Sequence, residues 1–316
     1  MAFRKENTEE YAALCNGLER MADLYKHKKD NATGKKQNRA VYIFRKACRI
    51  GPRETIRRIH SRLAGIDSGV SPALAEAEEK SAVRDTYYST ERIAVYTAEF
   101  GGYDEVLEPV IQPDNIDYFL LTDREAKQEG YWKPINPQQF VPPEYLESPV
   151  LANRWCKMHP ETLFPEYRYS IYIDSNFLIV SDFTVLINRM QDYPVAMFRH
   201  KNRDCVYDEV TACMIKKKAP REALERQRAL LKAHGVPEKY GLLEAPVIVR
   251  RHHDPRCMEL MDTWWQAFLE GSRRDQISLI DALWKLKIQP SEIGTLGPSI
   301  NLCNLFIRMP HKKGVE

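Results

Sequence analysis

From Arg92 onward, short apolar runs alternate with segments of helical pattern, and this alternation limits the fold more than any other feature of the chain. The apolar runs are rich in aromatic, β-branched and Thr residues, and they lie at 92–100, 117–123, 169–173, 194–200, 245–251 and 304–309. Helical patterns separate them, at 148–157, from 181, at 204–218, 220–234 and 254–270, and from 273. Ser148-Pro149 and Asp254-Pro255 predict two of the helix starts, and the proline-rich stretch from Lys133 predicts a loop. Strands that alternate with helices are typical of an α/β fold with a mostly parallel sheet. The sequence therefore predicts one α/β domain over residues 91–316.

The first ninety residues have a different character, with helical patterns and no strand signal. Residues 1–80 hold 17 Lys/Arg and 11 Asp/Glu, a net charge of +6, and residues 81–316 hold 30 and 33, a net charge of −3. Ten of the basic residues lie between Lys35 and Arg62, where Glu54 is the single acid. Such a block suits a membrane surface, a nucleic acid or an acidic partner, and equally a solvated helical face. We predict a basic helical extension over residues 1–90.

Composition and cysteine usage predict the compartment. Hydrophobic residues make up 43% and charged residues 29% of the chain, the balance of a soluble globular protein. The stretch MAFRKENTEE lacks an apolar signal-peptide core, and no apolar run approaches the ~20 residues of a membrane-spanning helix. The seven cysteines are scattered and never in C-x-x-C spacing, which indicates reduced thiols. We expect a cytoplasmic protein that residues 35–62 could attach peripherally to the inner membrane surface.

Polar residues follow several predicted strands, at the end where open α/β sheets bind their ligands. Asp174 and Asn176 flank one residue directly after the run 169–173, and Thr97, Asp123 and His200 lie at the ends of other runs. Two side-chain oxygens at this spacing suit Mg²⁺ or Mn²⁺, which keeps further positions for water and phosphate oxygens. Asp-x-Asn is also common in turns, so a turn without metal is the alternative.

Basic side chains near this edge could bind phosphate. Arg154 and Lys157 are three residues apart on a predicted helix and therefore share a face. Arg offers a fork and Lys a point charge to a diphosphate, although a solvated helical face has the same pattern. His311 and Lys313 follow the last predicted strand, where a histidine could bind a metal and a lysine a departing phosphate. A plain basic tail is the alternative for them.

Several common motifs are absent from the sequence. There is no GxGxxG after the first predicted strand, no GxxxxGK[ST], no HExxH and no GxSxG. Their absence argues against a Rossmann dehydrogenase, a P-loop enzyme, a zincin and a typical α/β-hydrolase.

Five stretches, taken in their order and spacing over residues 92–311, carry a family resemblance. They are "YTAEFGGYD" (96–104), "YFLLTD" (118–123), "NRWCKMHPETLFPEYRYSIYIDSN" (153–176), "FRHKNRDCVYDE" (198–209) and "RRDQISL" (273–279). The chain resembles GT-A-type glycosyltransferases, and more closely the glycosyltransferase-like family that includes bacterial capsule-associated proteins and plant mucilage-related proteins of the TOD/MUCI type. The resemblance implies a GT-A-like (Rossmann-like) mixed, mostly parallel sheet flanked by helices. It also implies a nucleotide-sugar donor, a UDP-sugar first, bound across the strand ends.

The resemblance also assigns the metal and sugar residues. Asp174-x-Asn176 is similar to the Asp-x-Asp metal motif of this fold, with Asn176 in place of the second carboxylate. His311 lies where some of these enzymes supply a late metal-binding histidine. Asp275-Gln276 resembles the Asp-Gln pair near the transferred sugar. The cofactor expected on this basis is a divalent cation, Mn²⁺ or Mg²⁺, bound by Asp174, Asn176 and His311.

The remaining residues would bind the donor and support catalysis. Asp123 and the backbone around Tyr96 and Thr97 would contact the nucleoside, while the other donor-binding candidates are Arg154, Lys157, Asp174, His200 and Lys313. A carboxylate would orient or deprotonate the acceptor hydroxyl, or stabilise an oxocarbenium-like centre. Asp275, beside Gln276, is the first candidate for it and Glu209 the second. The sequence does not distinguish inversion from retention.

The sequence thus predicts transfer of a sugar from a nucleotide-sugar to a glycan or lipid-linked acceptor, in surface polysaccharide biosynthesis. A catalytically silent GT-A-like scaffold with a basic helical N-terminus is the alternative, because Asn176 replaces a metal-binding carboxylate. A nucleic-acid-binding protein is a third hypothesis. The basic block fits it, but the net charge of −3 on residues 81–316 and the lack of a nucleic-acid motif argue against it.

Overall fold

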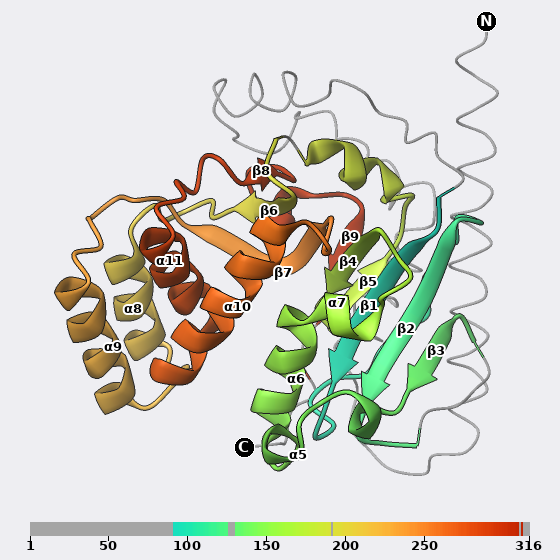
Figure 1. Ribbon diagram of the computed structural model, residues 1–316, viewed down its shortest axis with the longest axis horizontal. Coiled ribbons are helices and arrows are strands. Elements are labelled where there is room, and N and C mark those ends of the chain that lie inside the picture. The colour runs from blue at the N-terminus through green and yellow to red at the C-terminus, as the bar shows by residue number, and fades with distance from the viewer. Residues whose placement is uncertain (1–90, 126–129, 191, 310, 312–316) are drawn as a thin grey trace, which may run out of the picture.

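The computed structural model describes residues 91–125, 130–190, 192–309 and 311 (Figure 1). The predicted N-terminal extension 1–90, its basic block 35–62 and Lys313 lie outside the described residues. None of the described helices has the length and apolar character needed to cross a membrane.

A seven-stranded sheet with the order β3-β2-β1-β4-β7-β6-β8 forms the centre of the described domain. The strands β1, β2, β3 and β4 pair in parallel, as do β6 and β8. Within this described sheet, only β7 runs antiparallel to its neighbours, β4 and β6. The predicted mixed, mostly parallel sheet is therefore confirmed, with strand bounds β1 (Ile93–Glu99), β2 (Ile116–Thr122), β3 (Trp132–Ile135), β4 (Tyr169–Ile173), β6 (Val195–Arg199), β7 (Leu243–Arg250) and β8 (Gly294–Thr295).

Local sequence signals set where the helices begin. Ser148 accepts a hydrogen bond from the Leu151 amide at the start of one helix, and Asp254 accepts one from the Arg256 amide at the start of another. Each of these caps is followed by proline at the first helical position, as predicted. The helices are α5 (Pro143–Leu146), α6 (Pro149–Met158), α7 (Pro160–Leu163), α8 (Val206–Ile215), α9 (Arg221–Ala233), α10 (Pro255–Glu270) and α11 (Asp275–Lys285), with a 3₁₀ helix η1 (Pro137–Gln139).

Two predictions on secondary structure were wrong. The helix expected from 181 is a 3₁₀ helix, η2 (Thr184–Arg189), which follows a turn where Asp182 accepts hydrogen bonds from the Thr184 amide and hydroxyl. The proline-rich segment expected to be loop contains β3 at the sheet edge. Its Pro134 is tolerated there because an edge strand leaves one row of amides without a ladder partner.

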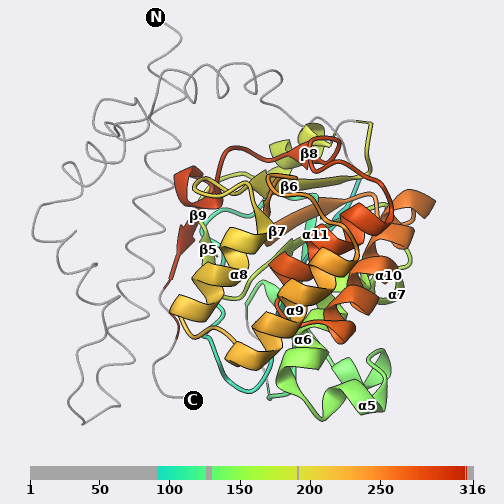
Figure 2. The ribbon, with the colours of Figure 1, turned by 90° about the vertical axis from the view of Figure 1, so that its left-hand side faces the viewer.

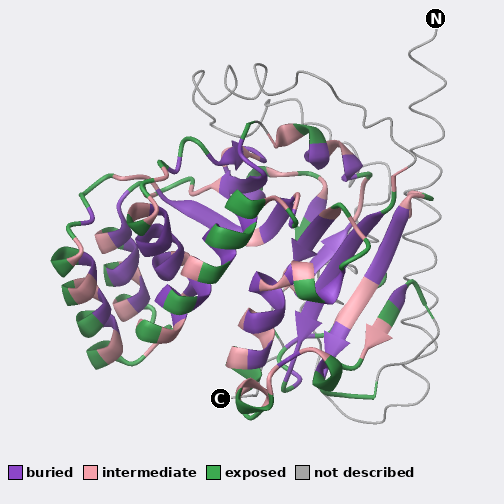
Figure 3. Ribbon diagram, in the orientation of Figure 1, coloured by how far each residue is buried: buried purple, intermediate pink, exposed green. Residues whose placement is uncertain are grey.

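The two faces of the sheet pack against different elements because side chains alternate along each strand. Ala94, Tyr96 and Ala98 of β1 face the helices α6, α8, α10 and α11, whereas Ile93 and Val95 face the opposite side. There η2, a further 3₁₀ helix η3 (Ile300–Leu302), and the antiparallel pair β5 (Phe177–Ile179) and β9 (Phe306–Arg308) cover the sheet. Figure 2 shows β5 and β9 across the sheet from α10, and Figure 3 shows the strands buried between the two layers.

The carboxyl ends of the parallel strands place the candidate site. In register, Glu99 of β1 lies beside Thr122 of β2, and β4 ends next to β1 at Ile173. The short β5–β9 pair returns the C-terminal segment to this edge, where the Met309 amide donates to the Asn176 carbonyl at 2.7 Å. Residues far apart in the sequence therefore meet at one edge of the sheet.

Candidate functional site

A fully buried arginine fixes the helix that bears the candidate phosphate-binding residues. Arg250 of β7 donates from one guanidinium nitrogen to the Lys157 carbonyl at 2.7 Å and from another to the Tyr96 hydroxyl at 2.5 Å. The Tyr96 hydroxyl in turn donates to the carbonyls of Cys156 and Lys157, both at 3.2 Å. These bonds fasten the last turn of α6 to β1 and β7. Tyr96 was predicted at the donor site. Its side chain lies in the core and supports the last turn of α6 through these bonds.

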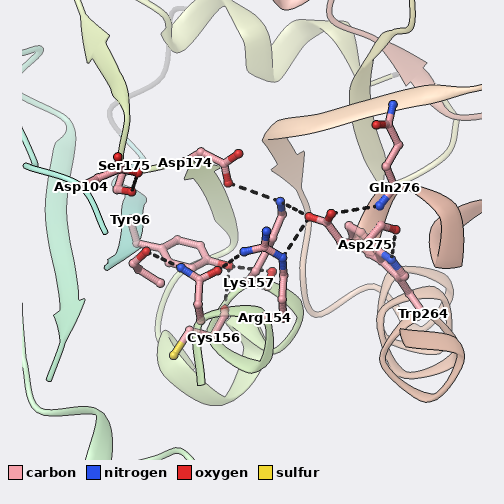
Figure 4. Close-up of polar contacts among 12 residues, drawn as sticks. Tyr96, Asp104, Arg154, Cys156, Lys157, Asp174, Ser175, Trp264, Asp275 and Gln276 are labelled. Atoms are coloured by element: carbon pink, nitrogen blue, oxygen red, sulfur yellow. Dashed lines mark hydrogen bonds and ion pairs between the residues drawn. The ribbon is translucent and has the colours of Figure 1, made fainter. Parts of the chain in front are cut away.

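Four charged side chains form a chain of ion pairs in front of this support (Figure 4). The Lys157 ammonium lies 2.9 Å from an Asp275 oxygen and 3.4 Å from an Asp174 oxygen, and Arg154 Nε lies 3.1 Å from Asp275. Lys157 is 1% exposed, and its ammonium also lies over the Tyr172 ring at 4.9 Å. The structure thus brings together Arg154, Lys157, Asp174 and Asp275 from α6, the β4 end and α11.

Asp275 is an ionised carboxylate in a buried position. Burial opposes its ionisation, but the charges of Arg154, Lys157 and Arg274 outweigh burial and hold the pKa of Asp275 far below its usual range. Its backbone carbonyl accepts from Trp264 Nε1 at 2.8 Å, and its second carboxylate oxygen accepts from the Gln276 amide at 3.0 Å. The side chain of Gln276 donates to the Leu243 carbonyl at 2.8 Å, which ties the start of α11 to β7.

The loop after β4 joins the ion pairs to the C-terminal segment. Ser175 donates to one oxygen of Asp104 at 2.9 Å, and the other Asp104 oxygen lies 2.9 Å from His311 Nδ1. Asn176 is buried and its side-chain amide donates to the Met309 carbonyl at 3.2 Å. Asp104 was missed by the sequence analysis, although it is the last residue of the stretch "YTAEFGGYD".

The donor atoms at this loop fit a cation that takes most of its ligands from elsewhere. When His311 Nδ1 donates to Asp104, its Nε2 presents a lone pair, the arrangement that orients metal-binding histidines. Asp174 is 29% exposed at its side chain and keeps lone pairs available. Within the described residues, no group of three or more His, Cys, Asp or Glu side chains could hold a metal ion. Asp174 and His311 are thus the side chains of this loop that could hold a cation, with its other ligands from outside the chain.

Gly101 and Gly102 form a turn shortly after β1, and this turn lies beside the end of β2. Gly101 and Gly102 both have positive φ, and the Gly101 amide donates to the Asp123 carboxylate at 2.9 Å. The φ of Gly102 is +71°, a backbone conformation that favours glycine at this turn. Asp123 is exposed beside the turn, whereas Thr97 is buried within β1 and its hydroxyl has no partner among the described residues.

The two other predicted residues, His200 after β6 and Glu209 on α8, both contact Arg203. Glu209 is 3% exposed and accepts from Arg203 at 2.6 and 2.7 Å. His200 Nδ1 accepts from the Arg203 amide at 3.0 Å, and its Nε2 lies 3.0 Å from the Arg203 guanidinium. Glu209 is therefore engaged by Arg203, while Asp275 is the predicted catalytic carboxylate within the ion pairs of Figure 4.

The sequence profile of the family described as "TOD1/MUCI70, glycosyltransferase-like domain" matches residues 75–311, most of the chain. The chain belongs to this family. The described strands, from β1 to β9, therefore lie within a TOD1/MUCI70 glycosyltransferase-like domain. No curated protein matches the sequence.

Solved glycosyltransferase structures are distantly similar to this TOD1/MUCI70 domain. The bifunctional glycosyltransferase WbbM, in its apo form, has 13% identity and a TM-score of 0.37, over 68% of this chain and 40% of that chain. Mouse xyloside xylosyltransferase 1, also apo, has 9% identity and a TM-score of 0.37, over 64% of this chain and 83% of that chain. An active-site mutant of LgtC has 9% identity and a TM-score of 0.36, over 60% of this chain and 70% of that chain. The matched part thus spans less than half of WbbM.

Proposed function

We propose that this protein transfers a sugar from a nucleotide-sugar donor, a UDP-sugar first, to a hydroxyl of a glycan or lipid-linked acceptor. The observation that carries the proposal is the set of ion pairs formed by Arg154, Lys157, Asp174 and Asp275 at the carboxyl edge of the sheet. Membership of a glycosyltransferase-like family supports it.

Arg154 and Lys157 would bind the donor diphosphate and stabilise the charge that develops on the departing nucleotide. Donors that are already in place when charge develops are the largest contributor to catalysis of this kind. Lys157 meets this requirement because α6 is fastened by Arg250 and Tyr96, and because burial leaves its ammonium few alternative positions.

A divalent cation would complete the diphosphate site. Arg154 and Lys157 already face the carboxylates of Asp275 and Asp174, so an incoming diphosphate adds negative charge that these pairs do not balance. Asp174 and His311 Nε2 would hold Mn²⁺ or Mg²⁺ together with phosphate oxygens. The bound cation supplies Lewis-acid stabilisation of the leaving group. Asn176 shapes the loop through its bond to Met309.

Asp275 would stabilise positive charge on the sugar or orient the acceptor hydroxyl. A carboxylate whose pKa lies far below 7 accepts a proton poorly, which disfavours general-base catalysis by Asp275 in its present pairing. An ionised carboxylate next to an oxocarbenium-like centre acts through its charge instead. Glu209, buried and paired with Arg203, is the second candidate for this role.

Calorimetric titration of the full chain with UDP, with and without Mn²⁺, tests the proposal. We expect UDP to bind more tightly with Mn²⁺, and uridine, which lacks the diphosphate, to bind far more weakly in both conditions. Absence of UDP binding under every metal condition would overturn the enzyme proposal. UDP binding that EDTA does not change would contradict only the proposed role of the cation. UDP binding without turnover of a UDP-sugar would support the catalytically silent scaffold.

We propose a place for the reaction as well, in surface polysaccharide assembly at the cytoplasmic side of a membrane. The basic block at residues 35–62 suits an anionic lipid surface, at about 1 kcal/mol per basic residue close to that surface. Co-sedimentation with vesicles containing anionic lipid should fall with salt and with charge reversal at Arg53, Arg57 and Arg58. Partitioning that ignores both changes contradicts a membrane role for the block.

A further inference from the structure

Basic side chains gather around α8 and Arg274, the residue before Asp275. The residues are Arg203, Lys216, Lys218 and Arg274, which we call the basic cluster, and His200 and Glu209 lie among them. Helix α8, whose end carries Lys216, packs against α11, whose N-cap is Arg274. Beyond α8 the chain turns back, and the Lys218 amide donates to the Cys213 carbonyl at 2.9 Å. Lys218 is thereby brought to the Arg274 side of α8.

Arg274 holds a buried donor that the described residues leave unused. Its carbonyl starts α11 by accepting from the Ile277 and Ser278 amides at 3.1 and 3.0 Å. Its Nε atom is buried and no described residue accepts a hydrogen bond from it. A buried donor without a partner costs stability, and more so when the group is charged. An acceptor from outside the chain would satisfy it.

The charges of the basic cluster act against one another. Partial burial of the ammonium and the charge of Arg274 lower the pKa of Lys218, and partial burial together with Arg203 and Lys216 lowers the pKa of His200. Glu209 lies within the cluster and is already paired with Arg203 at 2.6 Å. Asp275 is shared with Arg154 and Lys157. Repulsion of this kind is relieved by a bound anion.

We infer that the basic cluster is a subsite for a carboxylate or phosphate group carried by the acceptor or by the transferred sugar. Arg274 offers its fork and Lys218 a mobile point charge to such a group. The peptide bond between Arg274 and Asp275 places the anion next to the carboxylate that we assign to the reacting sugar. The link to the reaction rests on the proposed function, whereas anion binding itself is measurable without turnover.

Two adjacent lysines provide a matched pair of variants. Lys217 and Lys218 are adjacent, both are exposed and both follow α8, and the charge of Arg274 acts on the Lys218 ammonium. We would titrate the full chain, saturated with UDP and Mn²⁺, with glucuronate and with glycerol 1-phosphate by calorimetry. Lys218→Gln should weaken binding about tenfold, as expected for a hydrogen bond to a charged group, and Lys217→Gln less than twofold. Equal effects of the two substitutions contradict the inference.

A second titration tells whether the anion belongs to the acceptor or the donor. If the acceptor carries it, glucuronate or glycerol 1-phosphate binds alongside UDP. If the transferred sugar carries it, the wild type prefers UDP-glucuronate to UDP-glucose, and Lys218→Gln abolishes this preference. The inference is wrong if the wild type still binds UDP but binds neither probe and shows no preference for UDP-glucuronate over UDP-glucose. Loss of UDP binding itself overturns the proposed function instead.

Discussion

The candidate site has two halves that are built differently. The helix half consists of Arg154, Lys157 and Asp275, whose side chains are 24%, 1% and 11% exposed. The loop half consists of Asp104, Asp174 and His311, of which Asp174 is 29% and His311 42% exposed. The helix half is fixed before any ligand arrives, whereas the loop half has room to change partners. Such a division suits phosphate binding in the first and a cation completed by the ligand in the second.

The difference follows from what lies behind each half. Arg250 and Tyr96 fasten α6, and the Trp264 side chain holds the first carbonyl of α11. The loop half has the β5–β9 pair behind it and one contact between Asp104 and His311. Buried side-chain hydrogen bonds thus hold the helix half, whereas Asp104 and His311 of the loop half are held by each other and by Ser175.

The largest expected effect compares one carboxylate from each half. Asp275→Asn leaves the buried Lys157 ammonium with Asp174 alone, and loss of one partner from a buried pair costs about 3–5 kcal/mol. Asp174→Asn should cost less than about 1 kcal/mol, because Asp174 is partly exposed and lies farther from Lys157. Urea unfolding of both variants measures the difference. Equal losses would show that the two halves do not differ in rigidity.

A smaller effect concerns pH and a histidine behind the helix half. His252 is buried with Nε2 3.1 Å from the Phe164 carbonyl, and burial lowers the pKa of His252 to about 3. In the unfolded chain this histidine is protonated near pH 6.5, whereas in the folded chain it stays neutral until about pH 3. The free energy of unfolding therefore falls as the pH drops from 6.5 to 3. Between pH 8 and pH 5 this amounts to about 2 kcal/mol.

The matched pair His252→Gln and His253→Gln isolates that contribution. His253 is the exposed neighbour. Unfolding free energies between pH 8 and pH 5 should fall less steeply in His252→Gln than in His253→Gln and the wild type. The same slope in all three proteins would mean that His252 titrates normally in the folded state.

The smallest effect concerns the loop half alone. Asp104→Asn weakens the hold on His311 without touching Arg154 or Lys157. Loss of a group that orients a metal ligand typically reduces metal affinity 10–100-fold, and we expect about tenfold because His311 is half exposed. Mn²⁺ titration in the presence of UDP measures it, and UDP binding in EDTA is the control. A variant with normal Mn²⁺ affinity would exclude His311 as a ligand.

The sequence predicted the elements that repeat a local pattern. Helix caps such as Ser148 and Asp254, and the alternation along β1, follow from neighbours in the chain. The pairing of β5 with β9 could not be predicted, because it joins residues about 130 apart through strands of three residues. β9 was expected as the last strand, but it pairs outside the main sheet.

The charged residues show the same limit. Arg154 and Lys157 could be found from their helical spacing, and Asp174 from its place after a strand. Arg250 could not, because a charged residue ending an apolar strand usually marks the surface, whereas this one is fully buried. The ion pair between Lys157 and Asp275 joins residues 118 apart, and no local pattern predicts it.

Donor turnover by Asp275→Asn tests the central claim most directly. Release of UDP from a panel of UDP-sugars should be about 10²–10³-fold slower in the variant than in the wild type, as for loss of one electrostatic stabiliser, at a temperature where both are folded. UDP affinity should be equal or higher, because Arg154 and Lys157 lose a competing carboxylate. Unchanged turnover with UDP binding intact would contradict the role of Asp275 and leave Glu209 as the residue to test.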